Sequence, residues 1–377
     1  MKGRTKVHYI LSAAIAISLT SHLHAQERKT EVSIQGPHFQ INGAPTYQGV
    51  TWKNPEGKQI PMEGLLMNAR LVQGIFDDLN PETRDKWAYK DTGKWDPERN
   101  TFEFIKAMES WRQHGLLAFT INLQGGSPEG YSKEQPWINS AFDAKGNLRD
   151  AYMSRLAFIL KRADELGMVA IVGYFYFGQD ERLENEAAVI NAVDQATTWL
   201  LERNWRNVLV EINNECNVNY NHDILKPKRV HELIERVKST KTHGRRLLVS
   251  TSYGGGTLPG EQVIATSDYV LLHGNGVKAP RKMVELIEAT RKRIGVNAKP
   301  IINNEDDRPW RDKHQGFGEE GTNMIVSIEN GVSWGYFDYR EKGESIEQGF
   351  QNPPVDWSIN SGRKKQFFQL LKKVTSH

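Results

Sequence analysis

The chain has 377 residues, 25% of them charged, and a formal net charge of only +3. That balance gives no electrostatic reason to expect nucleic acid or an anionic membrane surface as a partner, and neither is predicted. The single cysteine, Cys216, excludes an intramolecular disulfide, so the hydrophobic core must stabilise the fold.

The first 25 residues have the pattern of a secretory signal. Basic residues between Lys2 and Lys6 precede an apolar stretch from Ile10 to Leu19, and Ala25 stands at a small-residue cleavage position. We expect residues 1–25 to be removed and residues 26–377 to form the mature domain. The protein would be secreted or periplasmic, without membrane insertion after cleavage. An uncleaved anchor is the alternative, but the apolar stretch is too short to span a bilayer.

Eight segments along the chain read as β-strands. Most are continuous apolar runs, which is typical of parallel strands covered on both faces. The predicted strands are Thr46–Trp52, Leu116–Asn122, Met168–Tyr176, Asn207–Asn213, Leu247–Ser252, Asp268–His273, Lys299–Asn304 and Val332–Asp338.

Helical patterns lie between these strands, including one that Thr101 could cap and one that Asp150 could cap. Repeated strand–helix alternation without a flexible linker predicts an α/β fold, a single (β/α)₈ TIM barrel. An open doubly wound sheet is the structural alternative. Before the first barrel strand, the segments 32–34 and 38–41 around Gly36-Pro37 predict a small N-terminal β-hairpin at the bottom of the barrel. The long segments 53–100 and 123–149 follow strands and would form the walls of a cleft.

Two of the predicted strands end in Asn-Glu steps, Asn214-Glu215 in VLVEINNECN and Asn304-Glu305 in KPIINNEDD. Carboxylates at the ends of barrel strands can reach a bound substrate, and two of them can cleave a sugar acetal by acid/base chemistry. Alternation places Glu211 on the same face as Glu215 inside the barrel, where it needs a partner, and Arg70 is one candidate.

The run Glu-Ile-Asn-Asn-Glu-Cys-Asn (211–217) resembles the fourth-strand motif of the clan A retaining glycoside hydrolases, especially the cellulase-like family 5. The resemblance implies that Glu215 is the general acid/base and that Asn214 binds a sugar hydroxyl. The segment Lys299–Glu305 is similar to the seventh-strand motif, which makes Glu305 the nucleophile. His273 resembles the histidine that follows the sixth strand in this family and lies near the nucleophile. Trp334 resembles the family's eighth-strand tryptophan, which lies below the bound sugar.

The chain departs from the family pattern at several positions, which indicates a divergent family. Cys216 replaces the usual proline, the second strand lacks an arginine, and Asn275 stands where many members have tyrosine. Asp306 directly follows Glu305, so the nucleophile could be displaced by one position. Residues at the strand ends are further candidates for substrate binding: Asn122, Tyr176 and Tyr253.

The sequence therefore predicts an exported retaining glycoside hydrolase that cleaves a β-linked oligo- or polysaccharide with two glutamates. A catalytically inactive carbohydrate-binding TIM barrel is the alternative, and a polysaccharide lyase a third option. No cofactor and no metal are predicted, because no phosphate-binding loop and no zinc-binding helix motif is found. Carbohydrate is the only expected partner.

Overall fold

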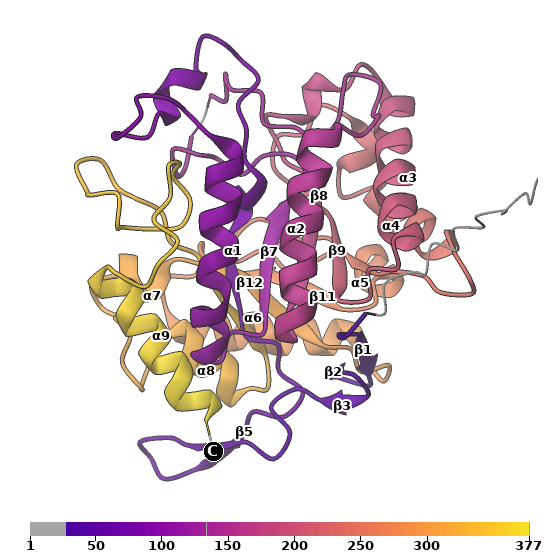
Figure 1. Ribbon diagram of the computed structural model, residues 1–377. Coiled ribbons are helices and arrows are strands. Elements are labelled where there is room, and N and C mark those ends of the chain that lie inside the picture. Colours follow the sequence, from indigo (N-terminus) through magenta and orange to yellow (C-terminus); the bar gives the residue numbers. More distant parts are fainter. Residues whose placement is uncertain (1–27, 133, 377) are drawn as a thin grey trace, which may run out of the picture.

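The structure is a computed structural model that describes residues 28–132 and 134–376. A barrel of eight parallel strands forms its centre, with helices packed around it (Figure 1). The predicted signal segment lies outside the described residues. The barrel strands are β6 (Asn68–Arg70), β7 (Ala118–Asn122), β8 (Val169–Phe175), β9 (Val208–Asn213), β10 (Leu248–Ser250), β11 (Val270–His273), β12 (Ile301–Asp306) and β13 (Ser333–Tyr336).

The barrel sheet runs in the order β10-β9-β8-β7-β6-β13-β12-β11, and every neighbouring pair is parallel. Within the described ranges the ladder does not join β10 to β11, so the barrel is nearly rather than fully closed. The predicted TIM-barrel class is confirmed, and the open doubly wound sheet is excluded.

The prediction of the first barrel strand was wrong. We expected it at Thr46–Trp52, but the strand is β6, and Thr51–Lys53 (β4) instead pairs antiparallel with Gln59–Pro61 (β5) at the bottom of the barrel. β6 has three residues, and two of them, Asn68 and Arg70, are polar although fully buried. The apolar run that identifies a parallel strand is therefore missing here.

The predicted N-terminal hairpin is confirmed. β1 (Val32–Gln35) pairs antiparallel with β2 (His38–Ile41), and the two-residue β3 (Ala44–Pro45) extends this sheet. Val32 and Phe39 belong to the hydrophobic cluster that fills the lower barrel, where the Phe39 ring packs edge-on against Tyr269. The hairpin closes the barrel at the end opposite the carboxyl ends of the strands.

The helices mostly follow the barrel strands, as a (β/α)₈ fold requires. The first begins earlier than predicted, since Asp96 and not Thr101 caps it and Pro97 occupies its first turn. The helices are α1 (Pro97–Gln113), α2 (Asp150–Leu166), α3 (Glu186–Glu202), α4 (Val230–Ser239), α5 (Glu261–Thr266), α6 (Pro280–Ile294), α7 (Arg308–Arg311), α8 (Asn323–Glu329) and α9 (Gly362–Thr375), with 3₁₀ turns η1 (Val72–Ile75), η2 (Arg84–Trp87), η3 (Asp180–Arg182) and η4 (Asp223–Leu225).

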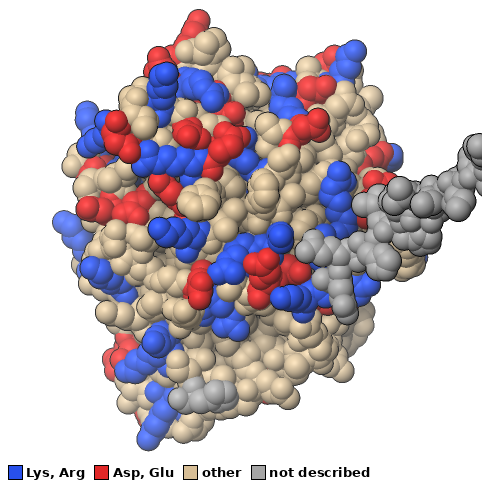
Figure 2. All heavy atoms as spheres, in the orientation of Figure 1, with Lys and Arg blue, Asp and Glu red and all other residues tan. Residues whose placement is uncertain are grey.

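Charges of both signs are interspersed over the face that α1 and α2 form (Figure 2). Several of them form ion pairs, such as Arg155 with Glu98 and Arg162 with Glu109. In the described part of the chain, no helix is both long and apolar enough to cross a membrane.

Candidate active site

Glu215 follows the end of β9, at the open end of the barrel. Its backbone has a φ of 53°, the left-handed region that side chains other than glycine rarely adopt. The backbone N–H of Glu215 donates to Ser252 Oγ at 2.9 Å, and the Ser252 hydroxyl donates in turn to Glu211. The buried Glu211 therefore supports the strained turn that carries Glu215.

Glu305 reaches the barrel mouth because β12 contains a bulge. In the pairing with β11, Leu272 lies opposite Asn303 but His273 lies opposite Glu305, which leaves Asn304 as an extra residue. Strict alternation from the interior residue Ile302 would have turned Asp306 inward. The bulge turns Glu305 into the site instead.

Asp306 points away from the site. Its carboxylate accepts the indole N–H of Trp334 at 3.0 Å and the backbone N–H of Arg308 at 3.0 Å. Of the two adjacent acids, Glu305 is thus the one that faces Glu215.

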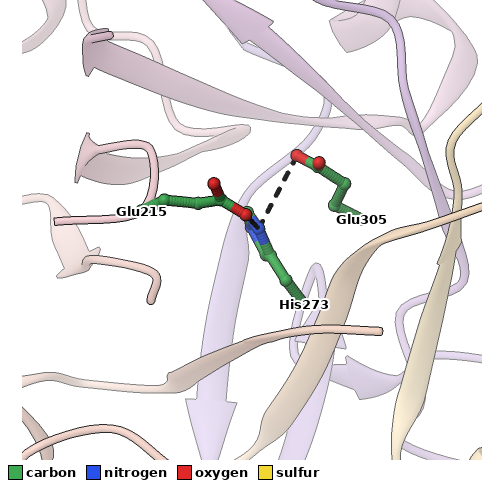
Figure 3. A group of neighbouring side chains, drawn as sticks. All are labelled: Glu215, His273 and Glu305. Atoms are coloured by element: carbon green, nitrogen blue, oxygen red, sulfur yellow. Dashed lines mark hydrogen bonds and ion pairs between the residues drawn. The ribbon is translucent and has the colours of Figure 1, made fainter. Parts of the chain in front are cut away.

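His273, at the end of β11, lies between the two glutamates (Figure 3). Its Nδ1 is 2.9 Å from Glu215 Oε1 and 3.6 Å from Glu305 Oε2. One oxygen of each carboxylate and one ring nitrogen all lie within 4.8 Å of one another. Retaining glycosidases have carboxyl groups about 5–5.5 Å apart, and the spacing seen here is compatible with that geometry.

Arg70, at the end of β6, connects the buried polar groups of the site. Its Nε is 2.7 Å from Glu305 Oε2, and its Nη2 donates to Asn214 Oδ1 at 2.6 Å. Its Nη1 lies 3.8 Å from Glu211. We had named Arg70 only as a candidate partner for Glu211, but its shortest ion pair is with Glu305.

Asn275 and Tyr131 complete the contacts of Glu305. Asn275 Nδ2 donates to Glu305 Oε1 at 2.7 Å, and the same amide lies 3.1 Å from the Tyr131 hydroxyl. Tyr131 comes from the long loop after β7, and nothing in its local sequence indicated a place in the site. Asn275 stands at the position where the resembled family often has tyrosine. In this protein Tyr131, from a different loop, places a phenol next to Asn275.

The electrostatics of the site couple its ionisable groups. Burial raises the pKa of Glu305 to about 7, although the Arg70 charge opposes that shift. Burial acts on Glu215 in the same way, but the hydrogen bond and charge of His273 outweigh it and lower the pKa of Glu215. For His273 itself, burial lowers the pKa, and the two carboxylates more than compensate and raise it. A proton taken up near neutral pH is therefore shared within this group.

The structure brings some of the other predicted residues to the site. Asn214 binds Arg70, as described above. Tyr176 is buried near Arg70 and is stacked on Phe177 with ring centroids 4.3 Å apart. Burial raises its pKa, and the negative charge of Glu305 adds to the increase. Asn122 lies inside the barrel, where its amide occupies the space that a side chain at Gly173 would need. Neither amide atom of Asn122 has a hydrogen-bond partner within the described residues.

Trp334 and Tyr253, which we predicted to bind substrate, lie outside the site, and this corrects that prediction. Trp334 is fully buried on the outer face of β13, where it packs on Phe367 of α9 and binds Asp306. Its strand neighbour Gly335 faces the barrel interior, so alternation turns Trp334 outward. The Tyr253 hydroxyl points toward Gly260 and contacts the Cys216 thiol in the outer core.

The two long loops that we expected to form the cleft walls pack against each other. An aromatic cluster joins them, in which Trp87 from the first loop meets Trp137 from the second with ring centroids 5.9 Å apart. Buried Asp78 fixes this contact, since it accepts the Trp87 indole N–H and the backbone N–H of Ile138. The walls are therefore rigidly built beside β6 and β7.

A divalent metal could find three donor atoms at this site, one each from Glu215, His273 and Glu305. The Arg70 guanidinium, however, already neutralises Glu305 at 2.7 Å and would repel a dication. The arrangement thus suits a pair of carboxylates better than a metal centre.

No protein-family model matches the chain, and no curated protein matches its sequence. Solved structures do resemble it in fold. A family 5 glycoside hydrolase from Prevotella bryantii superimposes with a TM-score of 0.51 at 14% identity, over 83% of this chain and 95% of that one. The fold is that of the family 5 glycoside hydrolases.

Two further family 5 structures give similar values. A broad-specificity endoglucanase from Clostridium cellulovorans has a TM-score of 0.50 at 13% identity, over 72% of this chain and 87% of that one. A xyloglucan-specific endo-β-1,4-glucanase from a metagenomic library has a TM-score of 0.50 at 13% identity, over 82% and 95%. Identities this low establish the shared fold and agree with a divergent family.

Proposed function

We propose that the protein is a retaining glycoside hydrolase that cleaves a β-linked oligo- or polysaccharide by double displacement. The observation that carries the proposal is the pair Glu215 and Glu305, which face each other across His273 at the carboxyl ends of two barrel strands. The fold shared with family 5 glycoside hydrolases supports it. A carbohydrate substrate, cleavage without a cofactor and export from the cell belong to the same proposal.

Glu305 is the nucleophile in this mechanism and Glu215 the general acid/base. Glu305 receives strong donors to its charged form from Arg70 and Asn275, both at 2.7 Å. Such donors favour the anion that must attack the anomeric carbon. Among the described residues, His273 is the one side chain within 3 Å of the Glu215 carboxylate, and Glu215 is the more exposed of the two carboxylates. It can therefore protonate the leaving oxygen and later activate a water molecule.

The coupled proton makes this mechanism possible near neutral pH. In the free protein Glu305 has the higher pKa, about 7, while that of Glu215 is lowered. The catalytic form of the pair holds one proton, and the roles require that proton on Glu215 when the sugar is bound. Because the two groups titrate together, only a shift of the proton by a few ångströms separates the two forms. The assignment of roles thus rests on the donors around Glu305 and is open to direct test.

The experiment replaces the nucleophile and adds an external one. In Glu305→Gly, turnover of an activated aryl β-glycoside should fall by several orders of magnitude, and azide should restore it. The recovered glycosyl azide should have the inverted α-configuration, because azide enters the space left by the carboxylate. A β-configured azide would assign the nucleophile to Glu215 instead. Full activity of Glu305→Gly would contradict the proposed function.

The adjacent Asp306 offers a matched control. Asp306→Asn removes a carboxylate one residue away while keeping an oxygen that can accept the Trp334 indole N–H. This variant should retain most of its activity, and azide should not change it. An inactive but folded Asp306→Asn, rescued by azide, would show that the nucleophile is displaced by one position. A folded wild-type protein that binds sugars and cleaves no β-glycoside would favour the inactive carbohydrate-binding barrel.

A further inference from the structure

The loop after β7 crosses the mouth of the barrel. We call residues 127–131 of this loop the bridge. At its far end, the Tyr131 hydroxyl lies 3.1 Å from Asn275 Nδ2 and 3.4 Å from Asp307 Oδ2. Asn275 follows β11 and Asp307 follows β12. Because β7 and β11 are four strands apart in the sheet order, they lie on opposite sides of the eight-stranded barrel.

Contacts with the loop after β13 hold the bridge in place. Gln351 Nε2 donates to the Ser127 carbonyl at 2.9 Å. The Tyr131 ring packs edge-on against Tyr339, with ring centroids 5.2 Å apart. Gly130 has a φ of +83°, and a Cβ at this position would come within 2.9 Å of the Tyr339 ring. The bridge is therefore anchored on three sides by side chains from the loops after β11, β12 and β13.

The two catalytic candidates differ in how far they are exposed to solvent. The Glu305 side chain is only 6% exposed, and it lies beneath the contact of Asn275 with Tyr131. Glu215 is 12% exposed, and the residues just after it, Asn217 and Asn219, are exposed. Access to the site is thus from the side of β9.

We propose that the enzyme acts on chain ends, with the terminal non-reducing sugar bound beneath the bridge and the rest of the chain leaving on the side of Glu215. In a retaining mechanism the nucleophile lies next to the sugar that is retained, and the acid lies next to the leaving group. The retained sugar is therefore on the covered side and the leaving group on the open side. A long chain extending in both directions would have to pass through the bridge. This inference rests on the proposed function and narrows it to exo-cleavage, in contrast to the neighbours that are described as endoglucanases.

A matched pair of substrates tests the inference. Aryl β-oligoglycosides of the gluco, manno, galacto and xylo series are prepared with a free non-reducing end and with that end capped by a ketal. The wild-type protein should cleave the free substrate of at least one series and the capped partner at least 50-fold more slowly. It should also cleave the aryl monoglycoside of that series. Equal rates for the capped and free members of a cleaved series would overturn the inference while leaving the proposed function intact.

A variant of the bridge provides the second measurement. The double variant Tyr131→Ala/Gln351→Ala removes the bonds that anchor the bridge at Asn275, Asp307 and the loop after β13. For this variant, the rate of cleavage of the capped substrate divided by that of the free substrate should be at least tenfold higher than for the wild type, and its melting temperature should be unchanged. An unchanged ratio would show that the bridge does not block the chain. If the folded wild type cleaves neither member in any series, the proposed function fails and this inference fails with it.

Discussion

At the scale of single residues, Arg70 strongly influences the protonation state of Glu305, the candidate nucleophile. Its guanidinium is buried, binds Glu305 of β12 and Asn214 just after β9, and lies 3.8 Å from Glu211 of β9. A buried carboxylate without such a partner would be largely protonated near neutral pH. Burial raises the pKa of Glu305 to about 7, and the charges of Arg70 and, second, His273 keep it from rising further.

Arg70→Met should change the pH dependence of the reaction as well as its rate. An opposite charge at this distance lowers a carboxyl pKa by about 1–3 units, so its loss should raise the pKa of Glu305 by a similar amount. Since the nucleophile must be ionised, the acidic limb of kcat/KM should move to higher pH by about 1–3 units. The check is a pH profile of kcat/KM from about pH 4 to 11, because the shift takes the limb from about 7 to about 8–10, alongside a melting curve that confirms folding. A lower rate with unshifted limbs would assign Arg70 a purely structural role.

The sequence identified some of these residues and could not identify others. Glu215 and Asn214 stand in a motif whose spacing is local, and both lie in the site. Tyr131 is one aromatic residue in a long loop, and only the path of that loop brings it to Asn275. Trp334 was assigned by resemblance alone, and the inward position of Gly335 turns it to the outer face.

At the scale of secondary-structure elements, two strands, β6 and β12, have features that a search for apolar runs does not detect. β6 was missed because its interior residues are Asn68 and Arg70, which serve the site rather than the core. β12 was predicted correctly as a strand, but its bulge depends on pairing with β11 and β13 and cannot be predicted from the sequence of β12 alone. Strands that end in polar interior residues at a barrel mouth are thus the ones that sequence patterns describe least well.

The inner face of β13 is held close to its neighbours by a glycine, which leads to a stability prediction. A Cβ at Gly335 would lie 2.2 Å from Asn68 Oδ1 and 2.9 Å from the Asn304 backbone. Gly335→Ala should therefore lower the free energy of unfolding by about 1–3 kcal/mol, the usual cost of overpacking. It should also lower activity, since Asn304 directly precedes Glu305.

Denaturant unfolding measures this cost, and Gly362→Ala is a suitable control. Gly362 begins α9, and a Cβ there would meet nothing within 4 Å. The control should be neutral or stabilising by about 0.4–1 kcal/mol. Equal stabilities for the two variants would contradict the close packing of β13 against β6 and β12.

At the scale of the whole molecule, buried acids link stability to pH. Burial raises the pKa values of Asp306 and Asp338 to about 6 each, and it raises the pKa of Glu305 to about 7. The unfolded chain releases these protons at its ordinary carboxyl pKa values near 4, so the folded state binds more protons between about pH 4 and 7. A raised pKa of His273 acts in the same direction.

The free energy of unfolding should consequently be lower at pH 8 than at pH 5. Asp306 alone should contribute on the order of 1 kcal/mol to that difference. Urea denaturation at the two pH values measures it, and Asp306→Asn should reduce the difference. Equal or greater stability at pH 8 would mean that these acids are ionised in the folded protein.

The architecture as a whole was the most predictable level. Strand–helix alternation predicted the (β/α)₈ class and the hairpin below it, because each strand and helix has to cover its apolar face. The crossing of the barrel mouth by the bridge could not be predicted, since it depends on contacts between loops far apart in the sequence, such as Gln351 with Ser127.

The bulge in β12 also has a consequence for how this chain is aligned with other barrels. One additional residue separates the interior position Ile302 from Glu305, relative to a strand of regular register. An alignment that counts alternate positions from Ile302 would pair Asn304 with the nucleophile of a regular barrel. Placing a one-residue gap at Asn304 restores the correspondence. In this protein the geometry of strand pairing therefore decides which residue, Glu305, aligns with the position of the proposed nucleophile.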